Sequence, residues 1–537
     1  MISSELSPLI QSLARPSIYP AEAWGDLPLC QRHVELIETH ISVIALTARR
    51  AYKLKKPLRF WDLLDYSSLE LRRHYCEEEV RLNRRLAPDL YLGVTELATP
   101  SGPEASVVMR RFDPATSLMV QLEEGRAGAP ELQAVGQRIA AFHADHPLVA
   151  AKPAALLRSF ARFVHSNLRA TRGSGEALIP EAVHRLLDQR LAMALRRQRR
   201  LLLSRLEGGW AVDGHGDLRL EHVLMDGPIA VIDCVEFNAE LRHIDGGSDL
   251  AFLVMELQAN GQADLIAPLL EGYSRTIEPA VLALFCAYRA HVRAKVAVVS
   301  GREARGQLSL ALAYASSSQA APALILLRGC SGSGKSHLAA ELAPWLLAEH
   351  LGSDRIRKQL HGLQPQQRTS GRERERLYSA EANRRTEASL LENARLSLER
   401  GQAVLLDATH LRQDSRQHAI ALAEQQRSPW LILNLHTPQG LIEQRLKQRQ
   451  LRDDDPSDAD GPIQAAQRAY SQPLTAAESE RTINYHFRYH PNRPNPPEDQ
   501  ATAPVITDPF ALLMEIWTRL AAAGGSSGRP LRLSARR

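Results

Sequence analysis

The sequence has few cysteines and no long hydrophobic run. Cysteine occurs only at positions 30, 76, 234, 286 and 330 of 537, and no two of them form a Cys-x-x-Cys pair. Such scattered thiols are typical of a reducing compartment and provide neither a disulfide framework nor a zinc site. No uncharged apolar segment approaches the roughly 18–20 residues that span a bilayer. The first residues also lack the basic start and apolar run of a signal peptide. We therefore expect a cytoplasmic protein without a membrane partner.

The sequence also has little excess of positive over negative charge. The formal charge is +5, and four arginines lie within 529–537, so subtracting them from +5 leaves +1 for the rest of the chain. A dedicated nucleic-acid binder usually carries a strongly basic face, and this balance gives no strong nucleic-acid signal. The apolar fraction of 44% is ample for buried cores.

The length predicts two or three domains. Residues 1–315 read as a small β-rich lobe followed by a larger helical lobe. A small, polar, proline-containing stretch follows, and 316–323 is the expected linker. Strands and helices alternate over 324–487, which favours a parallel sheet covered on both faces. The last part, 488–537, is expected to hold a proline-rich irregular segment, a closing helix at 509–524 and a flexible basic tail.

The strongest motif is "GCSGSGKS" at 329–336, which follows an apolar strand and precedes a helix as a phosphate-binding P-loop requires. Its backbone N–H groups are expected to surround the phosphates of a nucleotide. Lys335 would neutralise the β- and γ-oxygens, and Ser336 would bind Mg²⁺. The expected nucleotide-binding residues here are Gly329, Cys330, Ser331, Gly332, Ser333, Gly334, Lys335 and Ser336.

Two carboxylates and two arginines follow the P-loop. Asp354 comes after "HLGS" at the expected mouth of the sheet, where open α/β folds bind ligands. Asp407 ends the apolar run "AVLL" and suits a metal ion or its water. Arg445 and Arg449 lie on an expected helix and could cover the phosphates during transfer. The alternative for these arginines is a solvated helix face.

A second candidate site lies in the first half. "GHGDLRLEHVL" (214–224) places Asp217 in a His-Gly-Asp turn, and "VIDC" (231–234) places Asp233 at the end of an apolar strand. In kinase-like transfer one aspartate orients the acceptor hydroxyl and a second holds Mg²⁺. Asp217 fits the first role and Asp233 the second. The alternative is purely structural, with Asp217 capping a turn.

Such a site also needs a strand lysine for the phosphates and a helical glutamate to hold it. In "AYKLKK", Lys53 and Lys55 point to one side of a strand and Lys56 to the other. We prefer Lys53 as the phosphate-binding residue. On the following helix Glu79 shares a face with apolar residues, so it is the expected partner of Lys53. The alternative for Glu79 is a surface charge in an acidic cluster.

These motifs resemble two known families. "AYKLKK", "GHGDLRLEHV", "VIDCVEFN" and "DGGSDLAFL" make 35–310 similar to the aminoglycoside phosphotransferase family, which implies a bilobal protein-kinase-like α+β fold. By that resemblance Asp249 braces the catalytic loop. "GCSGSGKS", "SDRIRK" and "LLDATHLRQDSR" make 323–480 resemble P-loop (AAA-type) kinases akin to polynucleotide kinase and zeta toxins. That resemblance implies a parallel α/β sheet, Asp354 as the base and Arg445 and Arg449 in a lid.

One residue departs from the first family. His222 stands where asparagine offers Mg²⁺ a carbonyl oxygen, and Mg²⁺ prefers oxygen ligands. Three alternatives are open. His222 binds the metal through nitrogen, with Mn²⁺ in place of Mg²⁺; Glu221 or Glu236 supplies the oxygen; or the domain binds nucleotide and transfers phosphate poorly.

The leading hypothesis is a fusion of two kinases that use ATP or GTP with Mg²⁺ to phosphorylate a hydroxyl-bearing small molecule. The alternative is a regulatory protein, whose kinase-like half binds a ligand and whose P-loop half hydrolyses ATP. The two base-like aspartates favour catalysis, because nucleotide binding alone does not need them.

Overall fold

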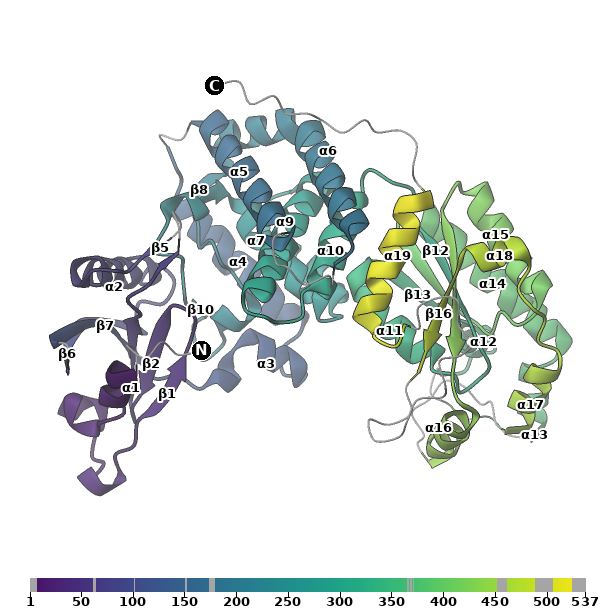
Figure 1. The fold of residues 1–537 in the computed structure, drawn as a ribbon, viewed down its shortest axis with the longest axis horizontal. Coiled ribbons are helices and arrows are strands. Elements are labelled where there is room, and N and C mark those ends of the chain that lie inside the picture. The colour runs from purple at the N-terminus through teal and green to yellow at the C-terminus, as the bar shows by residue number, and fades with distance from the viewer. Residues whose placement is uncertain are drawn as a thin grey trace. The chain divides into compact units, whose positions relative to one another are not determined.

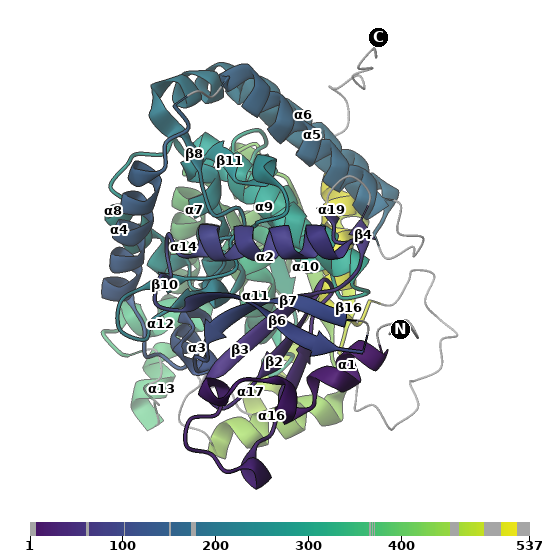
Figure 2. The same ribbon diagram turned by 90° about the vertical axis from the view of Figure 1, so that its left-hand side faces the viewer.

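The computed structural model describes residues 7–60, 64–100, 102–149, 152–172, 179–364, 367, 369, 371–451, 461–487 and 506–523. The chain forms two compact units (Figures 1 and 2). The first comprises Met1–Arg162, Arg199–Leu257 and Gln262–Glu278, and the second comprises Phe163–Gln198, Gln258–Gly261 and Pro279–Arg537. The domain boundaries expected at 315 and 324 remain predictions. Most of the proline-rich segment 488–508 and the tail 525–537 lie outside the described residues.

The first unit begins with an antiparallel five-stranded sheet of order β1-β2-β3-β7-β6. Its strands are β1 (Glu35–Glu38), β2 (Ser42–Leu46), β3 (Arg50–Lys55), β6 (Tyr91–Thr99) and β7 (Gly102–Arg110). The strand at β6 was not predicted. A short ribbon of β4 (Arg59–Phe60) and β5 (Leu64–Asp65) leads from β3 to helix α2 (Leu69–Asn83). Ser68 caps this helix by accepting a hydrogen bond from the backbone N–H of Leu71.

The two faces of this sheet are covered differently because strand side chains alternate. Tyr52 and Leu54 of β3 pack under the N-terminal segment, which includes helix α1 (Ser7–Leu13) and the buried Trp24. The opposite face packs against α2, which lies across the sheet in Figure 2. Lys53 and Lys55 lie on this second face, so β3 directs both ammonium groups towards α2. The sequence prediction that they share a side, opposite to Lys56, is confirmed.

A helical part completes the first unit. Its elements include α3 (Leu118–Glu123), α4 (Ala129–Asp145), α7 (Gly246–Ala259) and α8 (Ile266–Tyr273), with the ribbon of β8 (Ala211–Asp213) and β11 (His243–Asp245). Helices α4 and α8 pack at backbone distance: a Cβ built on Gly272 would lie 2.0 Å from the carbonyl oxygen of Gln133. Only glycine allows that approach.

A short hairpin lies between Asp217 and Asp233. β9 (Val223–Leu224) pairs with β10 (Ala230–Val231) in antiparallel register. His222 lies in the 3-10 turn Leu220–His222, which precedes β9. Asp233 was expected to end the second strand and instead lies two residues beyond it. His222 and Asp233 therefore both lie outside the two strands of the hairpin.

The second unit contains a parallel sheet of order β13-β14-β12-β15-β16. Its strands are β12 (Leu324–Arg328), β13 (Ala348–Gly352), β14 (Ala403–Asp407), β15 (Trp430–His436) and β16 (Thr482–His486). The strand at β16 was not predicted. The almost entirely apolar β12 and β15 are buried on both faces, as parallel strands are.

Helices cover both faces of the parallel sheet. One face packs against α14 (Ala380–Glu399) and α15 (Gln413–Gln425), and the other against α11 (Lys335–Leu346) and α19 (Pro509–Ala523) (Figure 1). The expected closing helix at 509–524 is therefore present. The following other helices lie entirely within this unit: α9 (Pro279–Val299), α10 (Arg305–Ser316), α12 (Ser353–Leu360), α13 (Gly371–Leu377), α16 (Gln439–Leu451), α17 (Gly461–Ala469) and α18 (Ala476–Glu480). The chain thus has the predicted fold class, an α+β kinase-like part followed by a P-loop α/β sheet.

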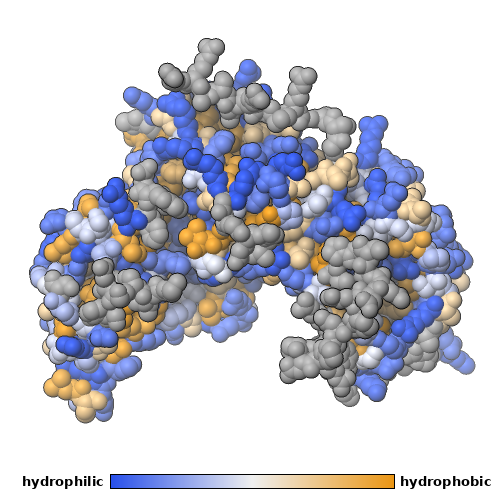
Figure 3. Space-filling model, viewed as in Figure 1, coloured by the Kyte–Doolittle hydropathy of each residue, from blue (hydrophilic) through white to orange (hydrophobic). Residues whose placement is uncertain are grey.

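Among the described residues, no helix is both long and apolar enough to cross a membrane. On the face drawn in Figure 3, hydrophilic and hydrophobic residues are interspersed.

Candidate functional sites

The first site is built around Lys53. Its ammonium lies 2.5 Å from Oδ1 of Asp233 and 2.9 Å from Oε1 of Glu79, which is fully buried. The predicted pairing of Lys53 with Glu79 is therefore present. Burial opposes the charged form of Lys53, but Asp233 and Glu79 together raise its pKa well above the usual value. Burial likewise opposes ionisation of Asp233, yet Lys53 lowers the pKa of this carboxyl. All three groups are charged at neutral pH.

Asp233 has an unusual backbone. Its φ of 65° lies in the left-handed region that a non-glycine residue rarely adopts. The surrounding residues hold it there: the Asp233 N–H donates to the hydroxyl of Tyr91 at 3.2 Å, and the next N–H, of Cys234, donates to Oδ1 of Asn83 at 2.9 Å. Backbone strain of this kind persists only where neighbours enforce it and is frequent at functional sites.

His222 lies beside both aspartates. Its Nδ1 is 2.9 Å from the backbone carbonyl oxygen of Asp217. A carbonyl only accepts, so Nδ1 carries the proton and the neutral ring keeps a lone pair on Nε2. That Nε2 lies 3.8 Å from Oδ2 of Asp233 and 3.6 Å from Oε1 of Glu221. His222 therefore directs Nε2 towards the carboxylates of Asp233 and Glu221.

Glu236 is differently placed. Its carboxylate accepts hydrogen bonds from Lys55 and from the hydroxyl of Tyr66, and its side chain is 6% exposed. These contacts favour His222 over Glu236 as a ligand beside Asp233, and Oε1 of Glu221 is itself paired with Arg219. Within the described ranges no group of three or more His, Cys, Asp or Glu forms a metal-binding cluster.

The His-Gly-Asp turn is held from behind by Asp249 at the start of α7. The carboxylate of Asp249 accepts from the backbone N–H groups of His215 at 2.6 Å and Gly216 at 2.9 Å. His143 of α4 reaches the same carboxylate, with its Nε2 3.3 Å from Oδ2. These contacts support the bracing role implied for Asp249.

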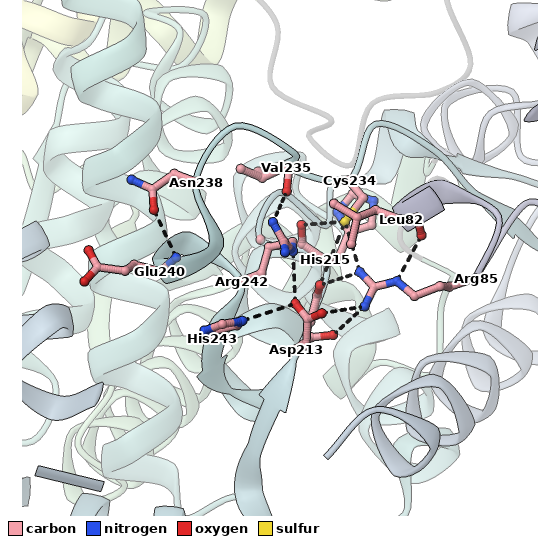
Figure 4. A network of polar contacts seen from close by, with 12 residues as sticks. Leu82, Arg85, Asp213, His215, Cys234, Val235, Asn238, Glu240, Arg242 and His243 are labelled. Atoms are coloured by element: carbon pink, nitrogen blue, oxygen red, sulfur yellow. Dashed lines mark hydrogen bonds and ion pairs between the residues drawn. The ribbon is translucent and has the colours of Figure 1, made fainter. Parts of the chain in front are cut away.

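Figure 4 shows a second set of hydrogen bonds and ion pairs that hold this site together, which the sequence did not reveal. Arg85, just after α2, donates to Asp213 at 3.1 Å and to the carbonyl oxygen of Gly214 at 3.2 Å. Arg242 donates to the other carboxylate oxygen of Asp213 at 3.0 Å and to the carbonyl oxygen of Val235 at 2.7 Å. The segments before Asp217 and after Asp233 are thus tied together through Asp213. No motif marks these residues, because the contacts join positions far apart in the chain.

The second site begins at the P-loop between β12 and α11. Gly332 and Gly334 have φ of 80° and 93°, which lets the loop turn its N–H groups inward. The Lys335 ammonium donates to the carbonyl oxygen of Cys330 at 3.0 Å, which bridges the loop. Lys335 and Ser336 form the first turn of α11, where the helix dipole favours bound phosphate.

Asp407 and Asp354 lie at the carboxyl ends of neighbouring strands. Asp407 is the last residue of β14 and is paired in register with Gly352, the last residue of β13. Burial opposes ionisation of Asp407, but hydrogen bonds from His350 and Ser336 and the charge of Lys335 lower its pKa. Ser336 and Asp407 are thus adjacent oxygen donors, of the kind Mg²⁺ prefers. Asp354 follows two residues after Gly352 in the first turn of α12.

His350 is a residue that sequence reasoning missed. Its Nε2 lies 3.0 Å from Oδ2 of Asp407. It is two positions before Gly352 on β13, and only the parallel pairing of β13 with β14 brings it to Asp407.

The predicted lid arginines lie on α16. The guanidinium of Arg445 stacks 4.4 Å from the ring centre of Phe487. A Cβ on Gly334 would lie 2.7 Å from its Nη1, so Arg445 does reach the P-loop. Arg449 lies one turn farther along the same helix.

The fold and the P-loop site place the second half of the chain in the class of P-loop α/β domains. Residues 324–474 match the AAA domain family, in which the P-loop holds nucleotide phosphates. Solved structures similar to this chain include a choline/ethanolamine kinase family protein from Mesorhizobium loti, 13% identical, with a TM-score of 0.35 over 63% of this chain and 99% of that one. The GDP and kanamycin complex of APH(2″)-IIIa is 12% identical, with a TM-score of 0.36 over 58% of this chain and all of that one.

Two mycobacterial relatives give the family. Uncharacterized protein Rv2004c of Mycobacterium tuberculosis and uncharacterized protein Mb2027c of Mycobacterium bovis are each 33% identical over 399 residues, which cover 70% of this chain and 78% of theirs. The chain belongs to the family of these mycobacterial proteins.

Proposed function

We propose that this chain is a kinase with two nucleotide sites, each moving the γ-phosphoryl group of ATP, or alternatively GTP, to a hydroxyl of a small molecule. The observation that carries the proposal is the ion pair between Lys53 and Asp233, 180 positions apart. It joins a phosphate-binding cation to a metal-binding carboxylate beside the candidate base Asp217. The domains proposed for the two activities are 1–315 and 324–487, in a cytoplasmic protein.

At the first site, Lys53 would bind phosphate oxygens while Asp233 and Nε2 of His222 hold the metal. Asp217 would accept the proton of the acceptor hydroxyl. The acceptor oxygen then forms a bond to the γ-phosphorus, the bond to the nucleoside diphosphate breaks, and the proton stays on Asp217. Bound Mg²⁺ or Mn²⁺ would supply charge neutralisation on the β- and γ-phosphates.

At the second site, the P-loop from Gly329 to Ser336 would surround the phosphates. Lys335 would neutralise them, while Ser336 and Asp407 would hold Mg²⁺. Asp354 would orient the acceptor hydroxyl, and Arg445 with Arg449 would cover the transferred group. The support is the adjacency of Ser336, Asp407 and Lys335 at the carboxyl edge of the sheet.

The test is a metabolite screen with γ-labelled ATP on the full chain and on its Lys53→Ala and Lys335→Ala variants. A labelled product that one variant loses and the other keeps is the expected result, and it assigns the product to one site. Steady ATP hydrolysis with no labelled metabolite from any variant would contradict the proposal. It would favour a regulatory protein in which the kinase-like half binds a ligand.

A further inference from the structure

A buried chain of alternating charges runs through the first site and extends beyond Lys53. Lys55, two positions along β3, donates to Oε2 of Glu79 at 2.7 Å and also to Oε1 of Glu236. The order of contacts is Asp233, Lys53, Glu79, Lys55 and Glu236. The side chain of Lys55 is 1% exposed and that of Glu79 is fully buried. A kinase-like site requires only the first lysine, so the second one needs its own explanation.

The two oxygens of Glu79 are divided between the two lysines. Oε1 faces Lys53 and Oε2 faces Lys55. When phosphate oxygens bind the Lys53 ammonium, they neutralise part of its positive charge. If Lys53 were the only partner of Glu79, the Glu79 carboxylate would then be only partly neutralised. An uncompensated charge in the interior is strongly unfavourable. Lys55 stays on Glu79 regardless of the nucleotide, because its own ammonium is enclosed by Glu79, Glu236 and the Tyr66 ring, whose centre is 4.9 Å away.

Lys55 also fixes the segment that carries Asp233. Glu236 lies three residues after Asp233, and its Oε1 accepts from the Tyr66 hydroxyl at 2.5 Å as well as from Lys55. Both donors belong to the small lobe: Lys55 ends β3, and Tyr66 lies between β5 and α2. Together with the backbone hydrogen bonds of Asp233 and Cys234, this contact fastens the segment that carries Asp233 to the small lobe that carries Lys53.

We propose that Lys55 is a positioning residue of the first site. It keeps Glu79 charged and in place while nucleotide binds Lys53, and through its contact with Glu236 it holds Asp233 in position to bind the metal. This role rests on the proposed nucleotide site. It predicts that Lys55 acts on the metal-dependent part of nucleotide binding, which is the part that uses Asp233.

The test uses the full chain with Lys335→Ala, which weakens ATP binding at the P-loop site. The affinity for ATP at the first site is measured with Mn²⁺ or Mg²⁺ and with EDTA, for Lys55→Met and for Lys56→Met. Lys56 is a matched control, since it is the adjacent buried lysine and its ammonium pairs with Glu38 and the carbonyl oxygen of Thr39. Lys55→Met removes two buried ion pairs, to Glu79 and Glu236, and Lys56→Met removes one ion pair at the end of the same strand, to the partly exposed Glu38.

We expect Lys55→Met to weaken ATP binding in metal by at least tenfold and to change binding in EDTA much less. Lys56→Met should lower thermal stability without altering the ratio of the ATP affinity in metal to that in EDTA. Lys55→Arg should restore most of that ratio. If Lys55→Met does not fold, Glu236→Gln, which keeps size and removes charge, should show the same loss.

The outcomes separate the two proposals. If the Lys335→Ala chain binds ATP and Lys55→Met, or Glu236→Gln in its place, leaves the ratio unchanged, the positioning role of Lys55 is wrong and the nucleotide site stands. If the Lys335→Ala chain binds no ATP with either metal or with EDTA, the first nucleotide site and the role of Lys55 fail together.

Discussion

The carboxylate of Asp249 lies 2.6 Å from the backbone nitrogen of His215, 34 positions earlier in the chain. The same carboxylate accepts from Gly216, so one fully buried group holds two successive N–H groups of the turn that presents Asp217. The position of the candidate base is therefore set by a buried residue on α7.

Replacing Asp249 by Asn should loosen this turn. The amide keeps the shape but offers one acceptor oxygen where two N–H groups need partners, and it removes a charge. Hydrogen bonds to charged groups contribute about 1.5–3 kcal/mol each. We expect unfolding of the first unit to become about 2 kcal/mol easier in a denaturant titration, with Asp264→Asn, an exposed position, as the control. Equal stability of the two variants would contradict the bracing role.

Asparagine at position 222 should change the metal preference of the first site. The His222 ring donates through Nδ1 to the carbonyl oxygen of Asp217, which leaves Nε2 for a metal. An asparagine would offer an amide oxygen, which Mg²⁺ prefers. In a Lys335→Ala background we expect His222→Asn to raise ATP affinity in Mg²⁺ relative to Mn²⁺ about tenfold. The exposed His33→Asn serves as control, and an unchanged ratio would remove His222 from the metal site.

Lys335→Ala should weaken nucleotide binding at the second site without unfolding it. Lys335 is largely buried and bridges the P-loop to the carbonyl oxygen of Cys330. Loss of a charge-assisted contact to phosphate predicts an affinity about 10–100-fold weaker. A fluorescent nucleotide titrated against the Lys53→Ala chain, with and without Lys335→Ala, measures it. Lys447→Ala, an exposed lysine on α16, should bind as tightly as its parent.

Gly272→Ala should destabilise the first unit through steric overlap alone. The added Cβ would lie 2.0 Å from the carbonyl oxygen of Gln133 on the facing helix, and neither backbone can move without disturbing α4 or α8. Overpacking of this kind costs about 3 kcal/mol. Gly208→Ala is the matched control, because its Cβ would meet nothing within 4 Å and its φ of −84° suits alanine. Denaturant unfolding of both variants tests the difference, and similar midpoints would contradict it.

His291 should make the stability of the second unit depend on pH. It is fully buried on α9, with Nε2 3.1 Å from the hydroxyl of Thr171, and burial lowers its pKa to about 3. The unfolded chain, with a histidine pKa of about 6.5, binds more protons between these values, so stability falls as the pH falls through this window. From pH 6.5 to 5 the loss is about 2 kcal/mol.

Urea unfolding at pH 7 and pH 5 checks this dependence. His291→Gln should remove about 2 kcal/mol of the difference between the two pH values. His418→Gln changes an exposed histidine and should leave the difference as it is. If both variants keep the parent's pH dependence, His291 is not the titrating group.

Local sequence patterns were sufficient for the main elements. The P-loop lies between β12 and α11 as its motif predicts, because glycines with positive φ and a following helix are local requirements. The alternation in "AYKLKK" placed Lys53 and Lys55 on one side of a strand, and the helical spacing placed Glu79 on a buried face. β6 and β16 were missed, since their pairing with β7 and β15 depends on distant partners.

The sequence by itself determined the P-loop motif, the α/β alternation of the second half, and the preference for Lys53 and Glu79, all of which follow from spacing along a few residues. The α+β class of the first half was implied by a family resemblance. Only the tertiary structure decided what surrounds them. It placed Asp233 in a left-handed turn beyond β10, turned Nε2 of His222 towards it, and engaged Glu236 with Lys55. These relationships join residues up to 181 positions apart, and a buried charge selects its partner by proximity in space, which spacing along the chain does not encode.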